Sequence, residues 1–114
     1  MDECLFCKIA AKQIPAELVY EDDRIIAFDD IRPQAPAHTL IIPREHFPSL
    51  NELPADRADL LSACLLAARK IAADKGIAAS GYRVVLNTAR DSGQEVFHIH
   101  FHLLGGRRMT WPPG

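Results

Sequence analysis

The chain has 114 residues, of which 48% are hydrophobic and 25% are charged, an ordinary composition for a globular domain. This length suits one hydrophobic core, so we expect a single domain over residues 1–114. The formal net charge of -2, from 13 basic and 15 acidic side chains, gives no general attraction to nucleic acid or to an anionic membrane.

The N-terminus, residues 1–4, lacks a basic stretch followed by an apolar one, so we expect no signal peptide. No apolar run approaches the roughly 20 residues of a membrane helix, so no membrane partner is expected. The three cysteines are an odd number, which argues against a secreted disulfide framework and for a reducing, cytoplasmic setting. Cys64 lies in an apolar helical stretch and should be a buried core side chain.

The first half of the chain predicts one short helix and three strands. The helix covers residues 4–12 and is stopped by Pro15. The strands are β-branched or aromatic runs: residues 17–20 and 25–28, joined as a hairpin through Asp22-Asp23, and residues 38–42, closed by Pro43. Residues 29–36 contain two prolines and must form a loop.

The second half predicts one long helix and two further strands. In the helix, residues 54–75, apolar side chains recur at helical spacing: Leu60, Leu61, Cys64, Leu65, Ala68, Ile71 and Ala72. Gly76 is the expected C-terminal cap. The segments that follow are a strand over 82–86, a polar loop over 87–95, a strand over 96–104 and an irregular tail over 105–114. This order predicts an α+β fold with a mainly antiparallel, five-stranded sheet and the long helix on one face.

The last strand contains the most informative motif, His-Ile-His-Phe-His-Leu-Leu at residues 98–104. Side chains alternate along a strand, so His98, His100 and His102 should share one face while the apolar residues between them pack against the helix. Three imidazoles in a row on one face indicate a reaction centre rather than ordinary core or solvated histidines.

A metal ion held by all three histidines is disfavoured by distance. Along a regular strand His98 and His102 would lie about 13 Å apart, whereas two nitrogens on one zinc ion lie about 3.4 Å apart. We therefore expect His100 to act as a nucleophile, because neutral imidazole attacks well at physiological pH and phosphorus is a natural target. The preceding Asp91-Ser92-Gly93-Gln94 offers a glycine where backbone N–H groups could approach phosphate oxygens, although many such loops are plain turns.

These residues resemble the histidine triad family, whose signature is His-x-His-x-His-x-x with apolar residues at x. Other segments are similar to its Hint branch of purine nucleoside phosphoramidases: Ile14-Pro15-Ala16, Phe28-x-Asp30-Ile31-x-Pro33-Gln34-Ala35-Pro36, His38-x-Leu40, Ile42-Pro43, Gly93-Gln94 and Leu104-Gly105-Gly106-Arg107. The terminal Trp111-Pro112-Pro113-Gly114 is similar to the ending of animal members. The resemblance covers almost the whole chain and implies a HIT-like fold whose sheet is extended by dimerisation.

The resemblance implies catalytic roles for four histidines. The middle histidine of the triad is the family's nucleophile, here His100, and it forms a nucleotidyl-histidine. His102 would contact the phosphate and the leaving group. His98 and His38 match positions that support the orientation and protonation of the nucleophile.

The resemblance also implies a nucleotide site, with Asp30 and Ile31 matching the ribose-binding pair. The phosphate-binding loop is matched by Asn87, Gly93, Gln94 and Glu95, and the apolar purine slot by Phe6, Ile9, Ile14 and Leu40, each of which could equally be a core residue. Glu95 departs from animal members, which have serine there. Because a carboxylate repels phosphate, we expect only the backbone of Glu95 to face it. A carboxylate turned into the site would instead favour a cationic leaving amine.

Cys4-Leu5-Phe6-Cys7 is a CxxC motif. A single pair is compatible with two free thiols or with a zinc site, and a redox role is disfavoured because no βαβ context surrounds it. The resemblance implies zinc, since several relatives hold it with such a pair, a histidine after the Ile-Pro strand and the first triad histidine. The matching residues are Cys4, Cys7, His46 and His98, the composition of a closed structural site. Animal Hint proteins lack the pair, so zinc should not take part in the chemistry.

The implied activity is hydrolysis of the P–N bond of adenosine or guanosine 5′-phosphoramidates, without a catalytic cofactor. The family also implies a homodimer, in which tails like residues 105–114 reach toward the partner's site and Trp111 acts as a selectivity element. One alternative is dinucleoside polyphosphate hydrolysis or nucleotidyl transfer, although the transferase branch replaces the histidine that is retained here as His102. Another alternative is a non-catalytic nucleotide- or partner-binding regulator.

Overall fold

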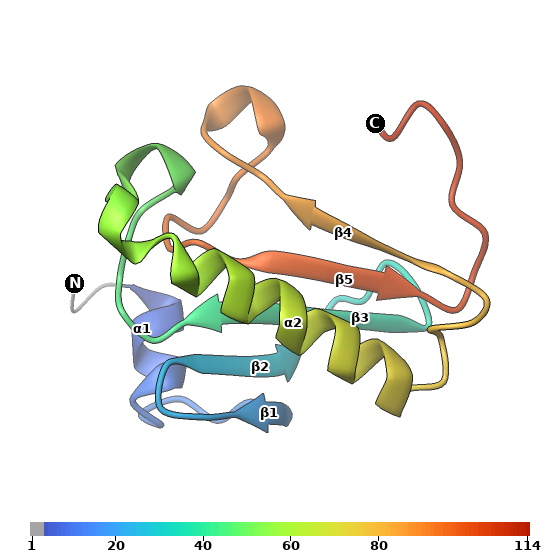
Figure 1. The fold of residues 1–114 in the computed structure, drawn as a ribbon, viewed down its shortest axis with the longest axis horizontal. Coiled ribbons are helices and arrows are strands. Elements are labelled where there is room, and N and C mark those ends of the chain that lie inside the picture. The colour runs from blue at the N-terminus through green and yellow to red at the C-terminus, as the bar shows by residue number, and fades with distance from the viewer. Residues whose placement is uncertain (1–3) are drawn as a thin grey trace.

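The computed structural model describes residues 4–114 (Figure 1). The expectation of no signal peptide concerned residues 1–4, and three of these, residues 1–3, lie outside the described residues. The elements are α1 (Leu5–Ala10), β1 (Leu18–Glu21), β2 (Ile25–Asp29), β3 (Ala37–Pro43), α2 (Asp59–Asp74), β4 (Tyr82–Leu86) and β5 (Phe101–Gly105). Short 3₁₀ turns occupy Leu50–Glu52, Ala55–Arg57 and Arg90–Ser92. Within residues 4–114, no helix is long and apolar enough to cross a membrane.

The strands form one sheet in the order β1-β2-β3-β5-β4, and every neighbouring pair is antiparallel. Helix α2 crosses one face of this sheet, whereas α1 lies at the end where β2 begins and β3 ends (Figure 1). The predicted α+β fold, with five antiparallel strands and one long and one short helix, is confirmed.

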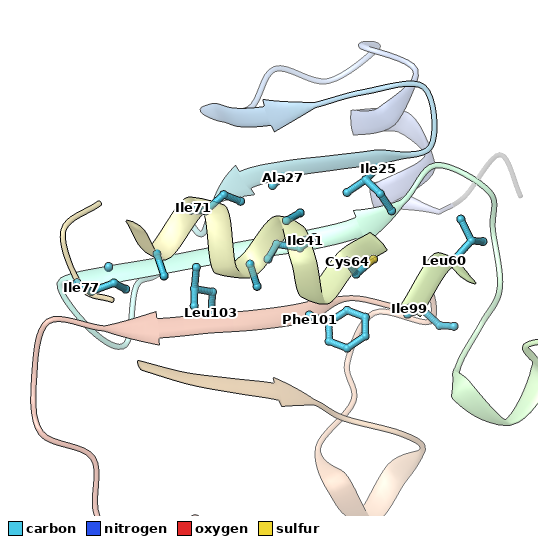
Figure 2. Close-up of a cluster of buried hydrophobic side chains, with 14 residues drawn as sticks. Ile25, Ala27, Ile41, Leu60, Cys64, Ile71, Ile77, Ile99, Phe101 and Leu103 are labelled. Atoms are coloured by element: carbon cyan, nitrogen blue, oxygen red, sulfur yellow. The ribbon is translucent and has the colours of Figure 1, made fainter. Parts of the chain in front are cut away.

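The main core lies between α2 and the sheet (Figure 2). Its apolar side chains come from α2, from β2, β3 and β5, and from the segments around them: Ile25, Ala27, Ile41, Leu60, Cys64, Ile71, Ile77, Ile99, Phe101 and Leu103. Cys64 is 1% exposed, as its position in the helix predicted. Leu65 is 47% exposed, so its predicted place in the core is wrong. Each helical residue turns by about 100°, which carries Leu65 from the buried side of Cys64 toward solvent.

A second, smaller core lies on the opposite face of the sheet. Here Phe6 and Ile9 of α1 pack against alternate side chains of β2 and β3: Ile26, Phe28, Leu40 and Ile42. A six-residue helix is marginal in isolation, so this packing is what holds α1 against the sheet. The Sγ atom of Cys4 also caps α1 by accepting the backbone N–H of Cys7 at 3.3 Å.

The predicted strand over residues 96–104 is too long, because β5 begins only at Phe101. Phe101 is the first β5 residue with partners, Ile41 in β3 and Leu86 in β4. In β3 the chain reaches Pro43 two residues later, and proline has no backbone N–H to extend a ladder. Two of the three triad histidines therefore precede the strand rather than belong to it.

The two helices are shorter than their patterns predicted. Helix α2 begins at Asp59 instead of residue 54, because the 3₁₀ turn Ala55–Arg57 comes first. Its predicted cap is confirmed, since Gly76 adopts a φ of 74° and donates its N–H to the carbonyl of Ala73. Helix α1 ends at Ala10, before Lys12 takes a left-handed conformation with φ 61°.

Gly105, expected to start the tail, is instead the last residue of β5. A Cβ atom at this position would lie 2.5 Å from Cδ1 of Ile77. Glycine therefore lets the segment after α2 pack directly on the sheet.

Candidate functional site

The four histidines predicted to be catalytic gather on the face of the sheet opposite α2. The apolar residues that alternate with the triad are buried against α2, and are Ile99, Phe101 and Leu103. The alternation predicted from the motif thus holds, although residues 98–100 lie outside the strand. His38 of β3 and His102 of β5 come together because these strands are neighbours, and their Nε2 and Nδ1 atoms lie 2.9 Å apart.

His100 is oriented by its own backbone neighbourhood. Its Nδ1 lies 2.8 Å from the carbonyl oxygen of His98. A carbonyl only accepts hydrogen bonds, so Nδ1 carries the hydrogen and Nε2 keeps a free lone pair. Burial lowers the pKa of His100 below its ordinary value, although the bond to His98 opposes this shift. The residue therefore presents a neutral, unprotonated Nε2 at physiological pH.

His38 and His102 form a chain with a fixed hydrogen-bond direction. The backbone N–H of Gln34 donates to Nδ1 of His38 at 3.0 Å, so the hydrogen of a neutral His38 sits on Nε2. That group donates to Nδ1 of His102 and leaves the His102 hydrogen on Nε2. Burial lowers the pKa of His38, and burial with neighbouring imidazoles lowers the pKa of His102 to about 4. The His102 ring lies in edge contact with His100, at 5.0 Å between centroids.

The two cysteines of α1 meet two histidines in what we call the thiol–imidazole cluster, Cys4, Cys7, His46 and His98. Nδ1 of His98 lies 3.4 Å from Sγ of Cys4 and 3.5 Å from Sγ of Cys7. Nδ1 of His46 lies 3.3 Å from Sγ of Cys7 and 3.2 Å from Nδ1 of His98. The four residues singled out in the sequence are thus brought together.

The cluster fits a tetrahedral zinc ion. With Zn–S of about 2.3 Å and Zn–N of about 2.1 Å, neighbouring ligand atoms lie roughly 3.4–3.8 Å apart, close to the distances of 3.2–3.5 Å found here. Nε2 of His98 lies 2.7 Å from the carbonyl oxygen of Pro43, and a hydrogen there leaves the Nδ1 lone pair for a metal. Burial lowers the pKa of His98 to about 4 and raises the pKa of the Cys7 thiol to about 11. A cation would favour the thiolate that burial disfavours.

Asp30, His38 and His102 also place three ligand atoms close together, but they do not suit a metal ion. A metal-bound imidazole normally donates its other N–H to an acceptor. Nδ1 of His38 faces the N–H of Gln34, which is a donor. The carboxylate of Asp30 has Oδ2 3.5 Å from Nε2 of His38, and its Oδ1 accepts the N–H of Arg32. The hydrogen bonds of this group instead leave a hydrogen on Nε2 of His102.

The loop before the triad is held from inside by Gln94. This residue is 6% exposed, and its Oε1 accepts the N–H of Ala89 at 2.8 Å while its Nε2 donates to the carbonyls of Pro48 and Val96. The Gln94 amide is thus occupied by the protein and is not free to bind a ligand. Gly93 adopts a φ of 89°. Glu95 is exposed, and Asn87 is half-buried directly after β4.

The residues predicted to contact base and ribose divide into buried and exposed ones. Phe6, Ile9 and Leu40 are buried in the smaller core, and Ile14 packs at its edge. The ring of Phe6 also meets His100 edge to face, at 5.0 Å between centroids. Ile31 is 91% exposed, and the Asp30 side chain beside it is 20% exposed.

Three residues that shape the site were given no role in it from the sequence: Gln34, Pro43 and Ala89. Gln34 and Pro43 act through a backbone N–H and a backbone carbonyl, so their side chains give no signal. Ala89 turns the loop with φ 68° and ψ -178°, a conformation taken almost only by glycine. An alanine in a polar loop gives no sequence signal for such a turn.

Comparisons with known proteins match almost the whole chain. A family model described as HIT domain matches residues 11–109. The purine nucleoside phosphoramidase of Escherichia coli K12 is 50% identical over 108 residues, which are 95% of this chain and 91% of that protein. An uncharacterized HIT-like protein of Synechococcus elongatus is 48% identical over 113 residues, 99% of this chain and 98% of that one.

Solved structures are equally similar. A HIT family hydrolase from Legionella pneumophila superimposes with a TM-score of 0.96 at 55% identity, covering 98% of this chain and 100% of that one. A histidine triad protein from Clostridium difficile gives a TM-score of 0.93 at 45% identity, covering 96% of this chain and 95% of that one.

Proposed function

The chain belongs to the HIT domain family, as its histidine motif predicted, and we propose that it is a hydrolase of purine nucleoside 5′-phosphoramidates. The observation that carries the proposal is the commitment of Nδ1 of His100 to the carbonyl of His98, which leaves Nε2 free to attack phosphorus. The 50% identity to a purine nucleoside phosphoramidase supports the substrate class.

In the first step Nε2 of His100 attacks phosphorus and the P–N bond breaks, which leaves a nucleotidyl-histidine. The leaving nitrogen needs one proton. The charge of a bound phosphate raises the pKa of nearby imidazoles, so His102 can take up a second proton on Nδ1 once the hydrogen bond from His38 opens, and it then delivers a proton from Nε2. Water then attacks phosphorus, His100 leaves, and the proton returns to the pair.

The nucleotide would lie across the surface between α1 and the loop before the triad. The backbone from Asn87 to Glu95 would receive the phosphate, with the open left-handed turn at Gly93 giving close access. Asp30 and Ile31 would hold the ribose, and Phe6, Ile9, Ile14 and Leu40 the purine. The exposure of Glu95 supports a role for its backbone rather than its carboxylate.

The proposal includes a structural zinc ion, a homodimer and a cytoplasmic setting. Zinc would be held by Cys4, Cys7, His46 and His98 and would crosslink α1 to the rest of the chain. Dimerisation is supported by exposed Leu65 and Leu66 on α2 and by β4, which pairs on one side with β5 and forms an edge of the sheet. The cytoplasmic setting is proposed from the odd number of cysteines in the sequence.

The test is to incubate the protein with adenosine 5′-phosphoramidate and, separately, with a diadenosine polyphosphate. We expect rapid release of AMP from the phosphoramidate and, after acid-free quenching, a nucleotidylated peptide that contains residues 98–102. His100→Ala should abolish both signals, while Cys64→Ala, a change in the main core, should keep them. Faster cleavage of the polyphosphate would favour the alternative branch. Turnover without an adduct on His100 would contradict the mechanism.

A further inference from the structure

Helix α1 connects the thiol–imidazole cluster to the nucleophile. Cys4 and Cys7 lie in the cluster, and Phe6 lies between them in the same turn of chain. The Phe6 ring lies edge to face with His100, at 5.0 Å between centroids, and with His98, at 6.1 Å. A movement of the α1 backbone that displaces the two thiols therefore also moves a side chain that contacts the nucleophile.

His98 makes a second connection, through the backbone. Its ring nitrogen Nδ1 belongs to the cluster, and its carbonyl oxygen accepts the Nδ1–H of His100. The next residue, Ile99, donates its N–H to the carbonyl of Phe47 at 2.9 Å, directly after the cluster residue His46. Residues 98–100 are thus fixed from both sides by segments that supply cluster ligands.

The energetics of α1 make this connection sensitive to the cluster. Six residues are too few for a helix that is stable by itself, and α1 depends on the small apolar core and on its cysteine cap. A closed site with two ligands from α1 and two from elsewhere would hold the helix in place. Without that crosslink α1 is held by the smaller core and by a hydrogen bond from Arg44 to the carbonyl of Ala10, and it can separate from the sheet while the main core under α2 stays intact.

We propose that Phe6 and His98 couple the thiol–imidazole cluster to the nucleotide site, so that zinc occupancy tightens nucleotide binding at His100. The inference rests on the proposed function, because it takes the surface beside Phe6 and His100 as the nucleotide site. Coupling between two sites is reciprocal, so the nucleotide must tighten zinc binding by the same factor. Phe6 and His98 are in this respect positioning residues, and removal of zinc or oxidation of its thiols would weaken substrate binding.

The experiment measures two affinities in the full chain by calorimetry. The Kd for AMP is determined in zinc-loaded and in metal-free protein, and the Kd for zinc is determined with and without saturating AMP. We expect each affinity to improve at least about fivefold when the other ligand is present, the lower end of ordinary coupling, and by equal factors. Equal Kd values in all conditions would overturn the coupling while leaving the proposed function standing. Absence of AMP binding in every form would count against the proposed function.

Two variants that keep all four ligands test the coupling even if the metal-free chain unfolds. Phe6→Leu keeps an apolar side chain and all four ligands, so it should bind zinc but show a smaller effect of AMP on zinc affinity. Its matched control is Ile9→Val, which alters the same apolar surface at a residue without ring contact to His98 or His100. Ile9→Val should keep the full reciprocal factor whatever its own AMP affinity. Equal factors in the two variants would remove Phe6 from the connection.

Discussion

Two groups of histidines lie on the same face of the sheet, and each brings two imidazole nitrogens close together. In the thiol–imidazole cluster Nδ1 of His46 and Nδ1 of His98 lie 3.2 Å apart, and in the second group Nε2 of His38 and Nδ1 of His102 lie 2.9 Å apart. Burial lowers the pKa of both His98 and His102 to about 4. Distance and protonation therefore do not distinguish the two groups.

The distinction comes from the partner of the other ring nitrogen. His98 turns Nε2 to a carbonyl, the acceptor at Pro43, so its Nδ1 lone pair is free for a metal. His38 turns Nδ1 to an amide, the donor at Gln34, so its Nε2 must carry a hydrogen. One backbone group at each place thus separates a candidate metal site from a hydrogen-bonded pair of imidazoles. His100 lies between the groups and is committed to the carbonyl of His98.

The largest expected difference between the groups is in metal binding. We expect one zinc ion per chain by metal analysis, lost in the double variant Cys4→Ser and Cys7→Ser but retained in His38→Asn. When free zinc exceeds its Kd about a thousandfold, binding adds about 4 kcal/mol to the free energy of unfolding. Thermal unfolding with and without a chelator measures that difference. Zinc retained by the cysteine double variant would contradict the assignment of zinc to Cys4 and Cys7.

In the His38–His102 pair we expect a smaller effect, a change in the free energy of unfolding with pH. An unfolded histidine has a pKa of about 6.5, whereas burial lowers the pKa of His102 to about 4. Between these values the unfolded chain binds more protons, so stability is full above pH 6.5 and falls as the pH drops toward 4. The shift corresponds to about 3 kcal/mol at most. Urea unfolding from pH 7 to 4 should show a steeper loss for the wild type than for His102→Asn, and identical slopes would contradict the burial of a neutral imidazole.

The smallest effect on stability is expected from the loop before the triad, where backbone conformation is changed and no histidine is involved. Ala89 is held at φ 68° and ψ -178° in the loop before the triad, and such a conformation costs an alanine about 1–3 kcal/mol. Ala89→Gly should therefore stabilise the protein by about 1 kcal/mol in urea unfolding. Gly93→Ala is the opposite change, at a glycine with φ 89° and open space around it, and should destabilise. A loss of stability in Ala89→Gly would show that the turn is not strained.

Much of the fold could be predicted from hydrophobic periodicity. The pattern located β4 correctly at Tyr82–Leu86 and placed Ile99, Phe101 and Leu103 on the α2 side of the sheet. The start of β5 could not be predicted, because it depends on where neighbouring strands end. Leu65 was misplaced because its apolar side chain alone does not tell which side of α2 faces the core.

The site could be predicted in its members but not in its hydrogen-bond directions. The triad and the CxxC motif indicated which side chains matter, and the structure brings Cys4 and Cys7 to His46 and His98. The directions are set by the carbonyl of Pro43 and the N–H of Gln34. These are backbone groups, so the identity of the side chain does not reveal their role. Only the folded chain shows which of these groups meets which ring nitrogen.

The most direct measurement is a long-range ¹H–¹⁵N spectrum of the imidazole rings of the zinc-loaded protein at pH 7. We predict hydrogen on Nδ1 of His100, on Nε2 of His38 and His102, and on Nε2 of His98, with all four rings neutral. Hydrogen on Nε2 of His100 would contradict this prediction, because that nitrogen could not then attack phosphorus. Hydrogen on Nδ1 of His38 would also contradict it, because Nε2 of His38 could not then donate to His102.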